Sequence, residues 1–304
     1  MYEENIAIIV VNYNNYLLTQ KCVTNLLQLR VKSHIVIVDN CSTNESFVSM
    51  TNFFMKFENV KVIQSEKNGG YSYGNNYGIH FAEKKWNNIE FLCIMNPDVI
   101  IEDNYFERLC QKLIKKENYA AIAPFMFLAG HFKSDSLSWN LIDNKKLYKE
   151  FNLLKFNKNQ RKTEYDIEEK ELLLADVLPG CFFIIKKSKF QEIGYFDENI
   201  FLYHEEDIIG LKFKNLNYKL LLDSSCYYLH NHFNNDKENV LYEYKYNFKN
   251  IKRNYDYEYN SRLYLCENFF HKKNKLKLKI TKLFNSLLLE AKHFYAVIKC
   301  SKKA

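Results

Sequence analysis

Short, continuous apolar runs alternate with amphipathic stretches over the first 125 residues of the chain. The run at residues 6–11 is rich in isoleucine and valine, which is typical of a strand buried on both faces. The same pattern predicts further strands at residues 35–38, 60–63, 91–95 and 120–125. Stretches with helical periodicity lie between them, at residues 16–29, 45–57, 69–86 and 103–116. This alternation predicts an α/β fold with a Rossmann-like, doubly wound, mostly parallel sheet and helices on both faces.

The second half of the chain has a less regular pattern. Residues 133–170 are polar and lack clear periodicity, which predicts a variable excursion. Ordered runs return at residues 172–185, 187–193, 219–222 and 226–229. Residues 242–304 are predicted to be helical, with one apolar stripe formed by Leu276, Ile280, Leu283, Leu287, Ala291, Phe294 and Ile298. We therefore expect a globular domain over residues 1–235 and a basic helical C-terminal extension over residues 236–304.

Charge is distributed unevenly along the 304 residues. The chain carries a formal net charge of +7, but residues 271–304 hold ten lysines and a single acid, Glu290, for a net of +9. The rest of the chain is close to neutral. A basic, amphipathic tail indicates contact with an anionic surface. The alternative is a helix face that the lysines merely keep soluble.

The cysteine spacing argues against a zinc-binding protein, and the longest uncharged stretch argues against a transmembrane protein. None of the eight cysteines forms a Cys-x-x-Cys pair, so a zinc site is not indicated. The first residues do not resemble a signal peptide, which favours a reducing cytoplasm. Residues 118–132 are uncharged, but they are fewer than the about 18 that a transmembrane helix needs.

Polar residues follow four successive predicted strands. In an open α/β sheet, ligands bind beyond the carboxyl ends of the strands, so these residues indicate a ligand crevice. They are Asn12, Tyr13 and Asn14 after the first strand, Asp39 after the second, Asn68, Gly69, Gly70, Asn75 and Asn76 after the third, and Asn96 and Asp98 after the fourth. The glycines do not match the dinucleotide fingerprint, and a Gly-Lys-Ser/Thr phosphate loop is absent, which disfavours dehydrogenases and ATPases.

Each residue of the predicted crevice has a structural alternative to a binding role. Asp39 can accept hydrogen bonds from a ribose or a base, or it can cap a helix. Gly69 and Gly70 allow close approach of the backbone to a ligand, or simply form a turn. Asp98 offers the carboxylate oxygen that Mg²⁺ or Mn²⁺ prefers, or serves as a turn residue after Pro97.

Two later motifs offer proton-transfer and metal-binding groups. Three adjacent carboxylates, Glu205, Glu206 and Asp207, repel one another, which raises the pKa of one and suits a general base. They also suit the start of a helix, where acids interact favourably with the dipole. His230 and His232 share one face of a strand, as metal ligands or as surface residues.

Taken in order, these motifs resemble family 2 glycosyltransferases, especially the bacterial rhamnosyltransferase-type enzymes of O-antigen and capsule polysaccharide assembly. The segments that carry the resemblance span residues 6–232. They are Val10–Asn14, Val38–Thr43, Asn68–Asn76, Met95–Asp98, Pro179–Phe183, Gly194–Glu198, Phe201–Asp207 and His230.

The resemblance implies a GT-A fold and a role for several residues. Asp39 corresponds to the family's nucleobase contact, and Asp98 to the last acid of its metal-binding Asp-x-Asp motif, whose first position is Asn96 here. Glu206 corresponds to the base, with Asp207 as the alternative because Ile208 occupies the next acidic position of the family's pattern. His230 corresponds to the metal-contacting histidine. His232 is its alternative, since the Gly and Ser that usually follow are missing.

The implied reaction is a single, inverting displacement that moves a sugar from a dTDP- or UDP-sugar, with rhamnose the commonest case, to a glycan or lipid-linked acceptor. It uses one Mn²⁺ or Mg²⁺ ion and one carboxylate base. Residues 1–125 would bind the nucleotide sugar and residues 172–235 would hold the base and acceptor. The expected location is the cytoplasm, with peripheral contact at the inner face of the cell membrane through the tail.

Two other classes of function compete with this interpretation. A nucleotidyltransferase that makes an activated sugar would share the sheet and the metal. A non-enzymatic nucleic-acid-binding protein would place basic residues around exposed aromatic side chains. The excess positive charge is confined to the last 34 residues, away from the glycine-rich and acidic motifs, so we expect no nucleic-acid partner.

Overall fold

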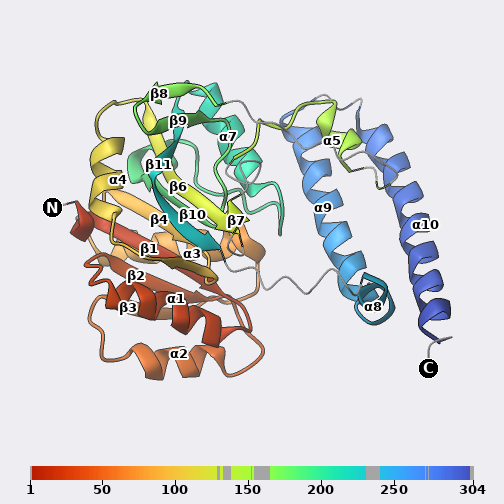
Figure 1. Ribbon diagram of the computed structural model, residues 1–304, viewed down its shortest axis with the longest axis horizontal. Helices are drawn as coiled ribbons and strands as arrows, with labels where there is room; N and C mark the ends of the chain where they lie inside the picture. Colours follow the sequence, from red (N-terminus) through yellow and green to blue (C-terminus); the bar gives the residue numbers. More distant parts are fainter. Residues whose placement is uncertain are drawn as a thin grey trace. The chain divides into compact units, whose positions relative to one another are not determined.

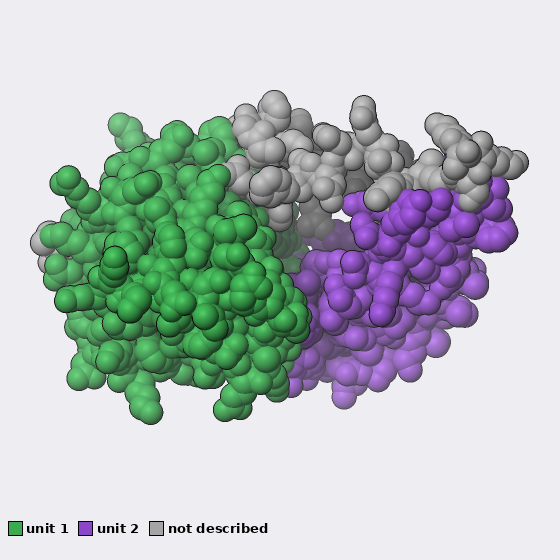
Figure 2. All heavy atoms as spheres, turned by 90° about the horizontal axis from the view of Figure 1, so that it is seen from below, with its two compact units in different colours: residues 1–141, 161–198, 205–232 green, residues 142–160, 199–204, 233–304 purple. Residues whose placement is uncertain are grey.

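The computed structural model divides into two compact units (Figure 2). Unit 1 comprises Met1–Leu141, Arg161–Glu198 and Glu205–His232, and unit 2 comprises Ile142–Gln160, Asn199–His204 and Phe233–Ala304. The structure describes residues 2–128, 131–132, 138–151, 153, 165–230, 240–270, 272 and 274–301. The division into a catalytic domain at residues 1–235 and a C-terminal extension at residues 236–304 stays a prediction.

The N-terminal half of unit 1 is a parallel sheet with helices on both faces (Figure 1). Its strands run in the order β3 (Val60–Gln64), β2 (His34–Asp39), β1 (Ile6–Asn12) and β4 (Phe91–Met95). The helices α1 (Tyr16–Gln28) and α2 (Ser46–Phe54) pack together, and α3 (Gly70–Lys85) packs against β1 and β2. Right-handed crossovers bring α3 to the face opposite α1 and α2. The doubly wound α/β fold predicted from the alternating pattern is confirmed.

The other half of the sheet mixes strand directions. Next to β4 lies β10 (Phe182–Lys186), antiparallel both to β4 and to β6 (Tyr119–Leu128), which is followed by β11 (Lys219–His230), parallel to β6. Shorter strands complete it: β5 (Val99–Ile101), β7 (His131–Phe132), β8 (Ile167–Glu169) and β9 (Leu172–Ala175). Three helices belong to this half: α4 (Phe106–Leu113), α6 (Lys187–Glu192) and α7 (Glu205–Asn215). The runs predicted at 219–222 and 226–229 are one strand, β11, whose pairing with β6 is irregular between Asp223 and Tyr227.

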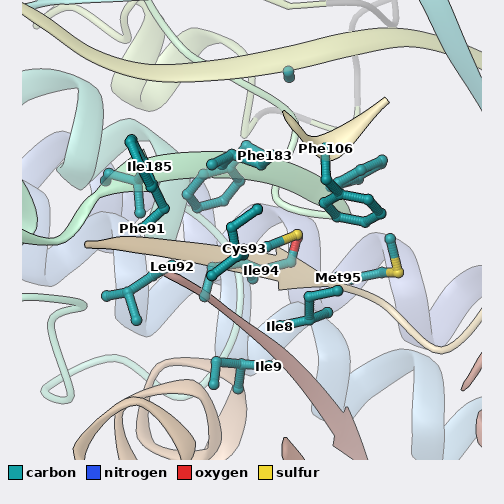
Figure 3. Close-up of a cluster of buried hydrophobic side chains, with 14 of the residues drawn as sticks. Ile8, Ile9, Phe91, Leu92, Cys93, Ile94, Met95, Phe106, Phe183 and Ile185 are labelled. Atoms are coloured by element: carbon teal, nitrogen blue, oxygen red, sulfur yellow. The ribbon is translucent and has the colours of Figure 1, made fainter. Parts of the chain in front are cut away.

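The core of unit 1 is centred on β4 and its neighbours. All five residues of β4 are buried, as expected for a strand covered on both faces. Figure 3 shows their side chains packed among Ile8 and Ile9 of β1 and Phe183 and Ile185 of β10. This rigid centre fixes the strand ends at which the polar motifs lie.

Unit 2 is helical. It contains α5 (Lys146–Lys149), α8 (Val240–Tyr246), α9 (Phe248–Asn268) and α10 (Asn274–Ser301). One face of α10 is buried in the unit through Leu278, Leu289 and Ala296. On that face the Asn285 side chain donates to the Phe151 carbonyl (2.5 Å) and accepts from the Leu153 amide (3.1 Å). Unit 2 therefore includes part of the predicted excursion as well as the predicted extension.

The predicted apolar stripe of α10 lies in solvent. Its six larger side chains are 41–68% exposed, and Ala291 is exposed as well. At 3.6 residues per turn, this stripe lies opposite the face that carries Leu278, Leu289 and Ala296. None of the helices in the described ranges is both long and apolar enough to cross a membrane.

Candidate active site

The strand order places a topological switch point between β1 and β4. From β1 the chain moves outward to β2 and β3, then returns to β4 on the other side of β1. Ligands of open α/β sheets bind at such a point, beyond the carboxyl ends of the strands. Asn12 ends β1, Asp39 ends β2, and Asn96 follows β4. The residues predicted to line a ligand crevice therefore follow strands on both sides of this switch point.

The carboxylate of Asp39 is the centre of a buried network. It accepts hydrogen bonds from the Asn12 side chain (2.9 Å), the Ser42 amide (3.0 Å) and the Gln64 side chain (3.1 Å). Asn12 in turn accepts from the Thr19 hydroxyl (2.9 Å). A carboxylate has about four acceptor positions, and three of them are filled here within the protein, where Asp39 is fully buried. In this position Asp39 orders the turn after β2; it does not cap the next helix, α2, which begins at Ser46 with Glu45 at its N-cap position.

The loops after β1 and β2 are linked to each other at the surface. Asn14 has a left-handed backbone (φ 57°), and its side chain accepts from the Thr43 amide at 2.8 Å. Its own amide donates to the Ser42 hydroxyl at 2.8 Å. Tyr13, beside it, is 47% exposed. This places an exposed aromatic ring above a well-ordered turn.

The glycine-rich motif forms the N-terminus of α3. Gly70 begins the helix with φ +89°, a conformation that L side chains rarely adopt. The Asn68 side chain accepts from the Gly70 amide (3.2 Å), which fixes the turn. The first turn of a helix presents backbone N–H groups and the positive end of the dipole, both of which favour a phosphate.

The two asparagines that follow make contacts within the protein. Asn75 donates to the Tyr71 carbonyl at 3.0 Å. Asn76 donates to the Phe196 carbonyl (3.0 Å) and to the Glu198 carboxylate (2.8 Å). Both are buried. Asn76 thus joins α3 to the loop after α6, whereas the bond of Asn75 lies within α3.

Asp98 and His230 lie together although they are far apart in sequence. β5 pairs with β11 so that Val99 is opposite His230, and this brings the Asp98 Oδ1 atom to 3.1 Å from the His230 Nε2 atom. Both side chains are largely buried. His232 lies outside the described residues. Across the described part of the chain, no group of three or more Asp, Glu, His or Cys side chains has a geometry that could hold a metal.

The pair fits a divalent cation that also binds a ligand. A carboxylate oxygen and an imidazole nitrogen are both donors that Mn²⁺ accepts, and Mg²⁺ is usually bound by one or two carboxylates together with substrate phosphates. Two protein donors leave most of the coordination positions for diphosphate oxygens and water. The small donor set is therefore suited to a metal that arrives with a diphosphate.

The three carboxylates predicted as a base cluster begin α7, but they point to different surroundings. Asp207 accepts from the indole nitrogen of Trp139 (3.2 Å), and Glu206 accepts from the Gly180 amide (3.2 Å). Glu205 and Asp207 are both 5% exposed, whereas Glu206 is half-buried. Successive residues of a helix are rotated by about 100° from one another, which separates the three side chains. The favourable interaction of acids with a helix start applies as well.

Gly180 makes room for the Glu206 carboxylate. A Cβ atom at position 180 would lie 2.3 Å from the Glu206 Oε1 atom, so a side chain there would displace the carboxylate. The hydroxyl of Tyr71, on α3, donates to the Gly180 carbonyl at 2.5 Å. Burial raises the pKa of Tyr71 well above its usual range, and the charges of Glu206 and Glu205 add to this, so the phenol stays a donor. The motifs contain Gly180 and Tyr71, but their spacing alone does not reveal this role, and nothing in the polar excursion indicates Trp139.

Asp98 and Glu206 both influence the same buried thiol, that of Cys181. Cys181 precedes β10, and its thiol lies 2.9 Å from the Tyr228 hydroxyl. Burial raises the pKa of Cys181 to about 12; the Tyr228 hydrogen bond opposes the increase, and the charges of Asp98 and Glu206 contribute to it. The Cys181 carbonyl also accepts from the Asn96 amide (2.8 Å). The start of β10 is therefore hydrogen-bonded both to the turn that holds Asn96 and, through Gly180, to the Glu206 carboxylate.

Two characterised relatives resemble the chain. The low-salt glycan biosynthesis hexosyltransferase Agl10 of Haloferax volcanii is 26% identical over 204 residues, which are 67% of this chain and 59% of that protein. Glycosyltransferase GlyG of Streptococcus pneumoniae is 28% identical over 123 residues, 40% of this chain and 39% of that protein. The chain thus matches less than two thirds of the length of either relative.

Two solved structures share the fold. GalNAc-T7 with UDP, GalNAc and Mn²⁺ superimposes with a TM-score of 0.56 at 18% identity, over 75% of this chain and 44% of that one. The mannosyltransferase PcManGT from Pyrobaculum calidifontis, in complex with GDP-Man and Mn²⁺, gives 0.54 at 12% identity, over 98% and 87%. At such identities the likeness concerns the fold alone, and it agrees with the GT-A fold implied by the sequence motifs.

The family match is independent of these pairwise similarities. Residues 7–194 match the domain described as glycosyl transferase family 2. The match includes the motifs around Asn12, Asp39, Asn68 and Asp98 and ends before the carboxylates of α7 and before His230. Since it covers more than half of the chain and the fold agrees with it, the protein belongs to glycosyl transferase family 2.

Proposed function

We propose that the protein is an inverting glycosyltransferase, which moves a sugar from a nucleoside diphosphate donor to a hydroxyl group of a glycan or lipid-linked acceptor. The observation that supports this most is that Asp98 pairs with His230, while the turn at Asn96 and the Glu206 carboxylate are hydrogen-bonded to the adjacent residues Cys181 and Gly180. A leaving diphosphate and an attacking hydroxyl need such groups on either side of one carbon atom.

Asp98 and His230 would hold the divalent metal, Mn²⁺ or Mg²⁺. When bound, such an ion supplies positive charge that stabilises a departing diphosphate. The chain itself supplies two donors brought together by strand pairing, and the backbone amide of Asn96, two residues before Asp98, donates a hydrogen bond to the Cys181 carbonyl. The relatives with known ligands, GalNAc-T7 and PcManGT, were both solved with Mn²⁺.

Glu206 is the proposed base. Among the three carboxylates of the cluster it is the most accessible, and the Gly180 amide orients it. It would accept the proton of the acceptor hydroxyl as the oxygen attacks the anomeric carbon, so that a single displacement inverts the configuration. Asp207, bonded to Trp139, is the alternative base, and Glu205 would raise the proton affinity of its neighbours.

The remaining rim residues would bind the donor. Asp39 would be the nucleobase contact, as the family's motif implies, and the α3 N-terminus would face the diphosphate. The proposed contacts are those at Asn12, Tyr13, Asn14, Asp39, Asn68, Gly69, Gly70, Asn75, Asn76 and Asn96. We propose dTDP- or UDP-sugars as donors, with rhamnose as the first sugar to test. In this assignment residues 1–125 bind the donor and residues 172–235 serve the acceptor.

The exposed stripe of α10 supports a membrane-bound acceptor. Lys275 and Lys279 flank one edge of the stripe and Lys277 the other, at 3.6 residues per turn. A helix with an apolar face bordered by lysines lies well in the plane of an anionic membrane surface. We propose that α10 brings the enzyme to the inner face of the cell membrane, where a lipid-linked acceptor would be found.

A donor screen tests the proposal. The full chain is incubated with Mn²⁺ or Mg²⁺ and a panel of dTDP-, UDP- and GDP-sugars, and release of the nucleoside diphosphate is measured with and without acceptor. Glycosyl transfer predicts release from one or a few donors. Formation of pyrophosphate from a sugar 1-phosphate and a nucleoside triphosphate, without turnover of any sugar nucleotide, would instead establish a nucleotidyltransferase.

A further inference from the structure

The segment that leads into the base helix folds with unit 2. Residues Asn199–His204 belong to unit 2, while Glu198 before them and Glu205 after them belong to unit 1. His204 is joined by a peptide bond to Glu205, the first residue of α7. Whatever fixes His204 therefore acts on the start of the helix that carries the proposed base.

One face of α9 contacts the segment Asn199–His204. The Ser261 hydroxyl donates to the Leu202 carbonyl at 2.8 Å. The rings of Phe201 and Tyr257 stack at 4.4 Å with an interplanar angle of 27°. The Asn199 side chain donates to the Tyr264 hydroxyl at 3.3 Å. Residues 257, 261 and 264 are spaced as neighbours on one side of a helix, so the three contacts act together.

An ion-pair chain holds the last residue of the segment. The His204 Nε2 atom lies 3.2 Å from the Glu258 Oε1 atom, and the Arg262 Nε atom donates to the same oxygen at 2.7 Å. Arg262 is itself buried and donates to the Leu147 carbonyl at 2.7 Å. Burial raises the pKa of Glu258, but His204 and Arg262 outweigh this and lower it to about 2. Glu258 is therefore ionised and interacts with both His204 and Arg262.

The backbone of the segment is in a conformation that requires support. Tyr203 and His204 are consecutive non-glycine residues with positive φ, 75° and 70°. Such residues persist only where their surroundings determine them, and they gather at functional sites. The contacts with α9 are made at Leu202, just before these two residues, and at the ring of His204, the second of them. They hold the backbone of the last residues before α7.

We propose that this α9 clasp, formed by Tyr257, Glu258, Ser261, Arg262 and Tyr264, positions the Glu206 carboxylate for proton transfer. The proposal rests on the proposed function of Glu206. The clasp residues are positioning residues: they touch the segment before the base and take no part in the reaction themselves. In this way the helices of unit 2 take part in catalysis through the chain segment that they hold.

The kinetic test compares two Glu→Gln substitutions on α9. Glu258→Gln removes the charge that ties His204 to Arg262, whereas Glu267→Gln removes a surface carboxylate that pairs with Lys275. A displacement of about 1 Å can cost about 10²-fold in rate. We expect Glu258→Gln to lower kcat about 10- to 100-fold with little change in the donor KM, and Glu267→Gln to leave both unchanged. Ser261→Ala, which is milder, should lower kcat in the same manner if Glu258→Gln does not fold.

A second readout needs neither donor nor metal. The chain has two tryptophans, and Trp139 is hydrogen-bonded to Asp207 in the first turn of α7. In a Trp86→Phe background, the fluorescence of Trp139 reports on the start of this helix. Glu258→Gln and Ser261→Ala should shift its emission, and Glu267→Gln should not.

The two readouts separate this proposal from the proposed function. If wild-type protein turns over no donor, the proposed function fails, and the emission of Trp139 still decides whether α9 positions the start of α7. If folded Glu258→Gln and Ser261→Ala variants keep the wild-type emission and, in an active enzyme, a kcat within twofold of wild type, the clasp does not position the base and the proposal is overturned.

Discussion

Apolar side chains serve the two units of this protein in different ways. In unit 1, the apolar strands β1, β2 and β4 are covered on both faces, and polar side chains gather where these strands end. In unit 2, α10 buries one apolar face and exposes another on its opposite side. The first arrangement gives a rigid support for a polar site. The second leaves a contiguous apolar surface of the kind that usually marks an interaction site.

Apolar patterns that look alike in the sequence thus have different roles in the two units, one in the core and one at the surface. Both regions contain regular apolar patterns, but only the neighbours in the fold determine whether a pattern ends in the core. Catalysis is expected at the rim of unit 1, and attachment at the exposed face of α10. Substitutions on the exposed face of α10 should therefore leave catalysis unchanged, and substitutions at the rim of unit 1 should leave attachment unchanged.

The largest effect is expected at the rim, from Glu206→Gln. The substitution keeps the shape of the side chain but removes the proton acceptor, so turnover should fall about 10²–10⁴-fold while donor affinity is kept. Asp207→Asn is the matched control, and its effect should be much smaller because Asp207 is buried against Trp139. Steady-state kinetics with the donor found in the screen measures both. A crippled Asp207→Asn beside a near-normal Glu206→Gln would move the base by one residue.

Asp98→Ala should have the next largest effect. It removes one of the two protein donors for the proposed metal, so donor binding and turnover should weaken together, by about 10²-fold in kcat/KM. Activity of the wild type should disappear with a chelator and return with Mn²⁺ or Mg²⁺. Titration of donor binding in the presence of Mn²⁺ checks the affinity directly. Full wild-type activity in the chelator would contradict a role for a metal.

The sequence predicted the sheet better than it predicted the site. Continuous Ile/Val runs have few alternatives to buried strands, so β1 to β4 and the helices between them follow from local pattern alone. Asp98 and His230 could be suspected individually, but their 3.1 Å approach depends on the pairing of β5 with β11. The role of Gly180 depends on a carboxylate from α7. Contacts of this kind join segments far apart in sequence, so local periodicity cannot predict them.

The sequence also left the surroundings of α10 undetermined. The stripe from Leu276 to Ile298 was recognised from its spacing, whereas the face that holds Leu278, Leu289 and Ala296 was not. The helix is apolar on two sides, and periodicity cannot tell which side finds a partner. Asn285 is a further example: it is polar, yet it is fully buried because it bonds to the backbone of residues 151 and 153.

A matched pair of leucines distinguishes the two faces of α10 by stability. Leu289 is 4% exposed and Leu287 is 61% exposed. Leu289→Ala should lower the free energy of unfolding by about 2–5 kcal/mol, because it leaves a cavity. Leu287→Ala should change it by no more than about 0.5 kcal/mol, as is usual for surface positions. Urea unfolding measures both, and equal losses would contradict the exposure of the stripe.

Leu283→Ser combined with Leu287→Ser should have the smallest effect on enzyme activity. It should act specifically on attachment to the membrane. Both side chains are exposed, so folding and donor hydrolysis in solution should be unchanged. Binding to vesicles with anionic lipid should be lost, because the apolar face no longer enters the interface. Wild-type protein should sediment with such vesicles at low salt and be released at high salt, since each basic residue near the surface contributes about 1 kcal/mol that salt screens.

Point substitutions test this better than truncation of the tail. Removing residues 272–304 would also remove Leu278, Leu289 and Ala296 from the core of unit 2, so lost binding would accompany lost folding. The other occupant of an apolar helix face would be a second copy of the chain. The net charge of +9 in residues 271–304 opposes such pairing through like-charge repulsion and favours an anionic surface instead. If wild-type protein ignores anionic vesicles at low salt but sediments as a dimer that Leu283→Ser with Leu287→Ser dissolves, the stripe is a protein interface and the membrane proposal is wrong.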